Sequence, residues 1–120
     1  MTRRAFAHDA VIALDDGGDP NAPGGAVTVA LCGHWDHPPP CPLAPHHTSA
    51  TETGDGVTLR ILFAANAEDE ARVRALIDQA LESGRITGPD GRTSTWVVRS
   101  SAASPVRPEE ADHAARLVDS

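Results

Sequence analysis

The sequence predicts an α+β fold, a two-layer sandwich in which a mostly antiparallel four-stranded sheet carries two helices on one face. Four segments alternate apolar and polar residues with the period of two that marks a half-buried strand. Two further segments carry apolar residues at helical spacing. Because each strand has one apolar face, two amphipathic helices packed on that face complete a core. The expected order is strand, strand, strand, helix, strand, helix.

The first part of the chain is expected to contain two strands joined by a loop. Residues 5–14 predict the first strand. One face of that strand consists of Phe6, His8, Ala10, Ile12 and Leu14. Residues 15–25 are dense in Asp, Gly and Pro, which favours a loop. Residues 26–33 alternate again and are expected to form the second strand.

The middle of the chain has the clearest patterns. Residues 57–65 alternate regularly and predict the third strand. Asn66 is a suitable N-cap for the helix that follows, and Gly84 is a suitable residue to end it. The apolar stripe of this helix consists of Val73, Leu76, Ile77, Ala80 and Leu81.

The last part of the chain predicts one more strand and one more helix. Residues 88–91 have the composition of a turn, and residues 93–101 predict the fourth strand. Pro108 suits the first position of the last helix. In general shape this arrangement resembles the ferredoxin-like fold, although no helix is indicated between the first two strands.

Length and charge restrict the function. The chain has 120 residues, and we expect one domain over residues 1–120. Its formal net charge of −7 makes nucleic acid an unfavourable partner. No apolar run approaches the roughly 18 residues of a membrane span, and no signal peptide is recognisable, so we expect a cytoplasmic protein without a membrane partner. Arg without any Lys, beside abundant Ala, Asp, Gly and Pro, indicates a GC-rich bacterial gene.

The residues most suited to chemistry gather in one segment. Residues 33–56 lack periodicity and are expected to form a long Cys/His/Pro-rich loop. Six thiol or imidazole side chains fall at or near its start: Cys32, His34, His37, Cys41, His46 and His47. Such ligands suit zinc, copper, nickel or iron rather than calcium or magnesium. The sequence therefore predicts a transition-metal site, with zinc as the expected ion.

The spacing of these residues matches no standard zinc-finger pattern and no His-Glu-x-x-His helix. On a strand, Cys32 and His34 would share one face, and a turn would bring His37 back to them. Cys41 and at most one residue of the pair His46-His47 would close the coordination sphere. Two cysteines in a cytoplasmic chain favour reduced thiols over a disulfide.

Other interpretations of the same segment stay open. The Pro-rich loop can be a recognition surface for a protein partner, anchored by Trp35 and Leu43. A small enzyme would use the Cys41 thiolate or an imidazole, and the sequence does not decide whether the chain is an enzyme. Cys32 can also be a small buried apolar residue.

Residues outside this segment add two minor hypotheses. His8 and His113 are isolated in the sequence, and His8 would join the site if the first strand lay beside the second. A homodimer would form through an exposed sheet face. The residues expected on that face are Thr28, Ala30, Thr58 and Arg60.

Overall fold

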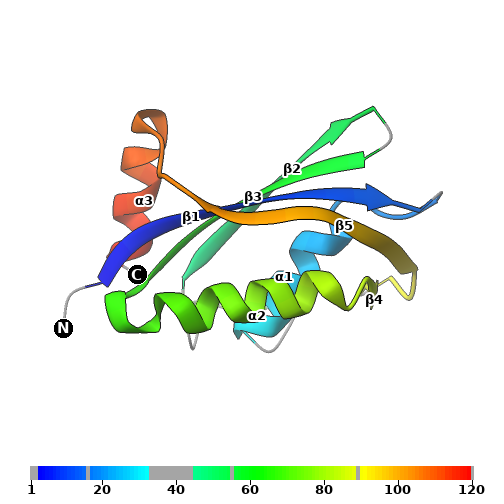
Figure 1. Ribbon diagram of the computed structural model, residues 1–120, viewed down its shortest axis with the longest axis horizontal. Helices are drawn as coiled ribbons and strands as arrows, with labels where there is room; N and C mark the ends of the chain where they lie inside the picture. The colour runs from blue at the N-terminus through cyan, green and yellow to red at the C-terminus, as the bar shows by residue number, and fades with distance from the viewer. Residues whose placement is uncertain (1–2, 16, 33–44, 55, 89, 120) are drawn as a thin grey trace.

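The computed structural model describes residues 3–15, 17–32, 45–54, 56–88 and 90–119 (Figure 1). The side chain of Cys32 is not among the described parts. In chain order the elements are β1 Arg3–Leu14, α1 Ala22–Cys32, β2 His46–Thr53, β3 Gly56–Asn66, α2 Glu70–Glu82, β4 Arg85–Thr87, β5 Thr93–Ser104 and α3 Ala111–Val118. Short 3₁₀ turns, Ala67–Asp69 and Pro108–Glu110, lead into α2 and α3. The class is α+β, as predicted.

The five strands form one sheet in the order β2-β3-β1-β5-β4, and every neighbouring pair is antiparallel. Because β1 and β2 both run antiparallel to β3, they are parallel to each other, with α1 connecting them. In the same way α2 connects β3 to β5, with β1 between these two strands. These two interlocked split βαβ units are the ferredoxin-like connectivity. The helix that the sequence did not indicate between the first two strands is α1.

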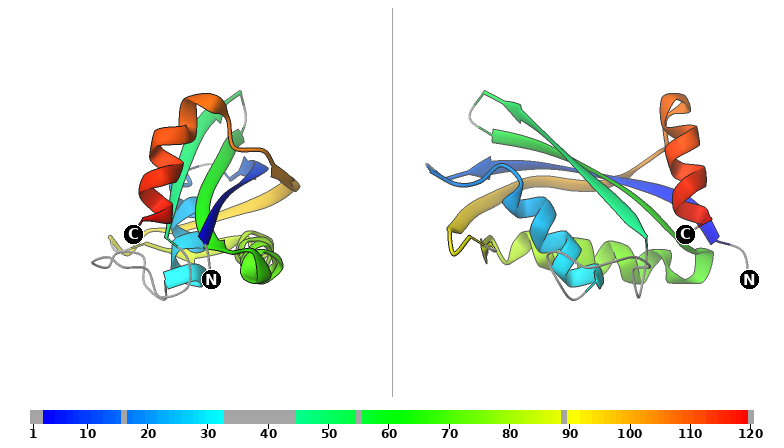
Figure 2. Two further views of the ribbon diagram at one scale, coloured as in Figure 1. Left: turned by 90° about the vertical axis from the view of Figure 1, so that its left-hand side faces the viewer. Right: turned by 180° about the vertical axis from the view of Figure 1, so that it is seen from behind.

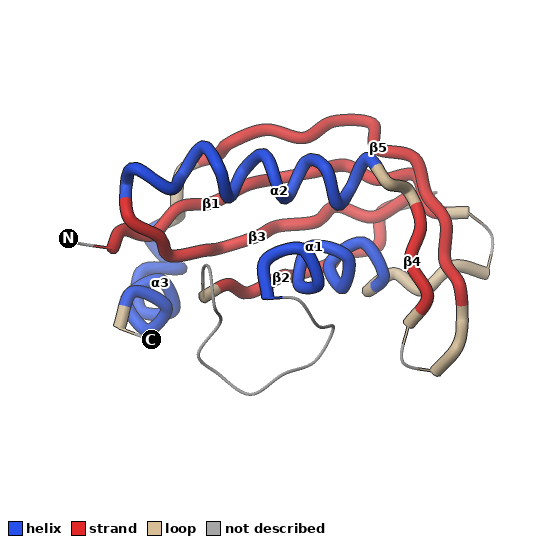
Figure 3. Tube along the Cα trace, turned by 90° about the horizontal axis from the view of Figure 1, so that it is seen from below, coloured by secondary structure: helices blue, strands red, loops and turns tan. Residues whose placement is uncertain are grey.

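The main core lies between the sheet and the pair α1 and α2, which cover the same face (Figure 3). The sheet contributes the inward residues of β1 and β3, which lie opposite the buried stripe of α2. The fully buried members include Ile12, Leu59, Ile61, Phe63, Val73, Ile77 and Leu81. The alternation predicted for residues 5–14 and 57–65 is therefore confirmed, and so is the stripe of the helix. Gly84 follows α2 with φ +67°, a conformation that favours glycine.

The prediction of a strand at residues 26–33 is wrong, because Ala22–Cys32 is the helix α1. Its first six residues are all buried, so they show no polar face from which a helical period could be recognised. Pro23 suits the first turn of a helix, and Thr28 Oγ1 donates to the carbonyl of Gly24, four residues earlier. The loop expected at residues 15–25 accordingly ends where α1 begins.

Three further details of the prediction are wrong. The loop expected at residues 33–56 contains β2, and the sheet gains β4, which makes five strands instead of four. A third helix is present, and α3 packs on the sheet face opposite α1 and α2 (Figure 2). This face is itself apolar at one end, where Leu117 of α3 meets Ala7, Leu62 and Ala64. An apolar patch of this kind needs a cover of its own.

Arg60 fastens α3 to this second face. Its guanidinium donates to Glu110 at 2.6 and 2.7 Å, to Asp9 at 2.8 Å and to Ser104 at 3.0 Å. The hydrogen bonds from Arg60 lower the pKa of Glu110 to about 2. Arg60 and Thr58 lie on the sheet, whereas Thr28 and Ala30 lie on α1. The four residues proposed for a dimer face therefore do not share one surface.

No helix in the described part of the chain is both long enough and apolar enough to cross a bilayer.

We predict that Glu110→Gln loosens α3. The substitution removes an ionised acceptor from a well-aligned guanidinium pair, and we expect a loss of about 1 kcal/mol of stability. Because the folded pKa of Glu110 is depressed from 4.5 to about 2, its contribution is present above pH 4.5 and is lost as the pH falls towards 2. Hydrogen exchange of residues 111–118 should therefore quicken in the variant. Glu109→Gln, a change at an exposed neighbour, is the control, and equal effects of the two substitutions would contradict the assignment.

Candidate metal centre at the start of β2

The first two residues of β2 face opposite sides of the sheet. His46 pairs with Phe63 and His47 pairs with Leu62 across the β2–β3 ladder. Directly opposed residues share a face, so His46 lies on the side of the main core and His47 on the side of α3. The six predicted ligands therefore cannot all meet at one ion, because β2 separates the last two.

His46 contacts α1. Its Nε2 lies 3.0 Å from Thr28 Oγ1, and the Thr28 hydroxyl donates to the carbonyl of Gly24 at 3.2 Å. A threonine hydroxyl carries one hydrogen. With that hydrogen on the Gly24 carbonyl, His46 must donate from Nε2, and the lone pair of the ring then lies on Nδ1. An N–H anchored in this way is the usual arrangement of a metal-binding histidine.

Close packing brings α1 against β2 at this point. A Cβ on Gly24 would lie 2.9 Å from Thr48 Oγ1, so the helix approaches the strand at a distance that glycine permits. Pro45, which is buried, accepts a hydrogen bond at 2.9 Å from the amide of Ala64 and so ties the entry to β2 onto β3. The first two turns of α1, from Gly24 to Thr28, are therefore held against the start of β2.

Cys32 is the last residue of α1, one helical turn beyond Thr28. His34, His37 and Cys41 lie outside the described residues, as do Trp35 and Leu43. Among the residues that are described, no three His, Cys, Asp or Glu side chains form a group that could hold a metal ion. The structure thus describes His46 and the backbone of Cys32, and the site itself stays a prediction from sequence.

On the opposite face, His47 meets His113 of α3. The two ring centroids are 4.6 Å apart, and the rings are tilted by 57°. A cavity of about 270 Å³ lies beside them. Its other lining residues are Ser49, Arg60, Leu62, Arg107, Glu109 and Glu110. Partial burial lowers the pKa of His47, and the neighbouring His113 lowers it further.

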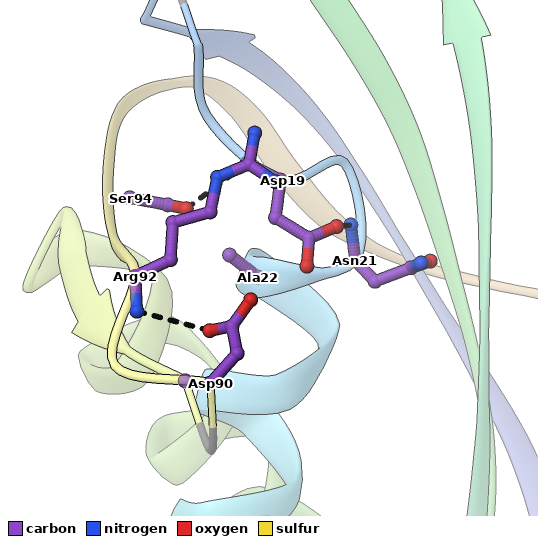
Figure 4. Close-up of a pocket in the computed structure, with 7 residues that line it drawn as sticks. Asp19, Asn21, Ala22, Asp90, Arg92 and Ser94 are labelled. Carbon is purple, nitrogen blue, oxygen red and sulfur yellow. Dashed lines mark hydrogen bonds between the residues drawn. The ribbon is translucent and has the colours of Figure 1, made fainter.

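A second hollow, of about 330 Å³, lies at the N-terminal end of α1 (Figure 4). Its carboxylates are occupied by local hydrogen bonds: Asp19 Oδ1 accepts from the amide of Asn21, and Asp90 Oδ1 accepts from the amide of Arg92, both at 2.9 Å. Arg92 in turn donates to the carbonyl of Gly17. The polar residues of this hollow therefore stabilise the turns that surround it.

His8 does not meet the condition for joining the site, because the segment expected as the neighbouring second strand is the helix α1. Its Nε2 lies 2.8 Å from Ser101 Oγ, and Ser101 donates to Asp78 at 2.6 Å. Arg74, a donor without acceptor capacity, lies 3.0 Å from Nδ1, so the proton of the neutral ring is on Nε2. With this tautomer the imidazole donates to the serine, whereas the histidine of a catalytic triad accepts the serine proton.

No family model, no curated protein and no solved structure matches this chain. The class that the structure defines is an α+β protein with ferredoxin-like connectivity, an added edge strand and a third helix on the second face. Fold class alone does not specify activity. The function has to be argued from the residues around β2.

Sequence reasoning missed two residues of this region. Thr28 was expected on a strand, and its contact with His46 arises because α1 is a helix. His113 is isolated in the sequence, because 65 residues lie between it and His47, whose ring it contacts in the structure. No local pattern reports a contact of this kind.

We predict that His8 makes the protein sensitive to acid. Burial lowers the pKa of His8 below 6.5 in the folded protein, and Asp78 partly opposes this. The unfolded chain therefore takes up the proton first, and stability should fall as the pH drops below 6.5. His8→Gln should flatten this loss, and Asp78→Asn should steepen it. Urea unfolding between pH 8 and pH 5 measures both slopes, and a wild-type slope in His8→Gln would refute the role of His8.

Proposed function

We propose that this protein binds a transition-metal ion, with zinc as the expected ion, at the junction of α1 and β2. The proposed ligands are drawn from Cys32, His34, His37, Cys41 and His46. His47 is set aside, because it lies on the other face of the sheet. Thiolate together with imidazole favours zinc among the abundant cellular metals.

The observation that carries this proposal is the contact between Thr28 and His46. It supports a site in two ways. First, it joins α1, whose last residue is Cys32, to β2, whose first residue is His46. Second, it orients the His46 ring, and in the tautomer that donates from Nε2 to Thr28 the lone pair is on Nδ1, which supports a role as a metal ligand.

The number of protein ligands would determine the chemistry. Four ligands from the five candidates would close a tetrahedral sphere and make the metal structural. Three ligands would leave a position for water or a substrate, and the metal would then act as a Lewis acid. The net charge of −7 favours the capture of cations in either case. A reducing cytoplasm, which we propose as the location, would keep both cysteines available as thiolates.

The adjacent histidines provide a matched pair of variants. We expect wild-type protein purified without chelator, or reconstituted under reducing conditions, to hold about one equivalent of zinc. His46→Gln should weaken zinc binding at least tenfold in competition with a chromophoric chelator, whereas His47→Gln should not change it. Thr28→Val should weaken it by roughly tenfold, because loss of a residue that orients a ligand typically costs 10–100-fold in affinity. Cys41→Ser tests the thiolate.

Two results would contradict the proposal. One is less than about a tenth of an equivalent of every transition metal after reconstitution. The other is an equal loss of metal in His46→Gln and His47→Gln, which would show that the face of the sheet does not matter. Circular dichroism of each variant without metal is the control for folding.

A further inference from the structure

The second face of the sheet carries a pair of imidazoles that the proposed function does not use. His47 comes from β2 and His113 from α3, and their ring centroids are 4.6 Å apart. Both line the cavity of about 270 Å³ between the strand and the helix. Two histidines from elements far apart in sequence thus meet at an accessible hollow, on the side of the sheet away from His46.

Two charged neighbours in this cavity, Arg60 and Glu110, are already engaged. Arg60 is bound by Asp9 and Glu110, and Glu110 also accepts from the amide of Arg107. In contrast, no hydrogen bond is recorded for the His47 or His113 ring within the described ranges of the chain. The nitrogens of both rings therefore remain available for a ligand.

We propose that His47 and His113 form a separate, open site for a divalent transition-metal ion. Zn²⁺ binds imidazole nitrogen at about 2.0–2.1 Å, which puts two nitrogens of a tetrahedral ion about 3.3 Å apart. Rings with centroids 4.6 Å apart reach that separation through small rotations of their side chains. One nitrogen from each ring binds the ion, and water fills the remaining positions.

Glu109 is the carboxylate placed to assist. It lines the same cavity and stands four residues before His113, on the 3₁₀ turn that runs directly into α3. Residues four apart in a helical segment lie on one side. No three potential ligands are assembled among the described residues, so Glu109 is not placed as a third metal ligand. It acts through its negative charge, which attracts the cation.

This site differs in ligand chemistry from the one proposed around His46. It contains imidazole and no thiol, and affinity for such nitrogen ligands rises from Co²⁺ through Ni²⁺ to Cu²⁺. Ni²⁺ is a suitable probe because it does not oxidise cysteine. An ion held by both rings also links β2 to α3, so binding should slow the exchange of amides in α3.

The test is an isothermal titration of the full chain with Ni²⁺, after saturation with zinc and removal of the excess. We expect about one equivalent of Ni²⁺ to bind with micromolar affinity. His47→Gln and His113→Gln should each weaken this binding at least tenfold, and Glu109→Gln severalfold. Glu52→Gln, at an exposed position of β2 outside both proposed sites, should leave it unchanged. Hydrogen exchange of residues 111–118 with and without Ni²⁺ gives a second readout that is confined to α3.

The outcomes separate the two proposals. Ni²⁺ binding that persists in His113→Gln, or that is absent from the wild type, overturns the site formed by His47 and His113. Loss of Ni²⁺ binding in His46→Gln with retention in His113→Gln assigns the ion to the α1 side and also overturns it. Failure of zinc to bind, with Ni²⁺ binding lost in His47→Gln and His113→Gln, supports this site and refutes the function proposed for the other face.

Discussion

The pairing of β3 with both β1 and β2 is the constraint on which the rest of the structure depends. From Val57 to Phe63 the inward side chains of β3 are fully buried, which prevents the strand from shifting by one residue. The same register determines where the side chains of β2 point. Because His46 opposes Phe63 and His47 opposes Leu62, the core of the protein decides which histidine faces α1 and which faces α3.

The fold was predictable where one side of an element meets the core and the other meets water. α2 and β5 have this pattern, as does β3 from Val57 to Ile61, and their positions followed from it. The first half of α1 is buried on every side, so its apolar run carries no helical period. α3 was predicted as a helix, but the sheet face on which it packs was not. Leu62 and Ala64 lie on the outer side of β3, and the sequence does not show that a helix covers them.

The candidate site was predictable as a composition and not as a geometry. Clustered Cys and His indicated metal binding through the chemistry of their side chains. The contacts of Thr28 with His46 and of His113 with His47 could not be predicted, because each depends on tertiary packing between elements. The expectation that at most one of His46 and His47 joins the site follows from strand alternation once β2 is recognised as a strand.

A strand that presents adjacent histidines to opposite faces gives the protein two chemically different environments from one short sequence. On the α1 side, thiolates in the proposed ligand set favour tight, slowly exchanging zinc. On the α3 side, two imidazoles beside an exposed carboxylate favour weaker binding with open positions. The sheet keeps these environments apart, because the adjacent residues His46 and His47 of β2 face opposite sides of it. The two proposals therefore assign each histidine of β2 to its own ion and do not pool the ligands of the two faces.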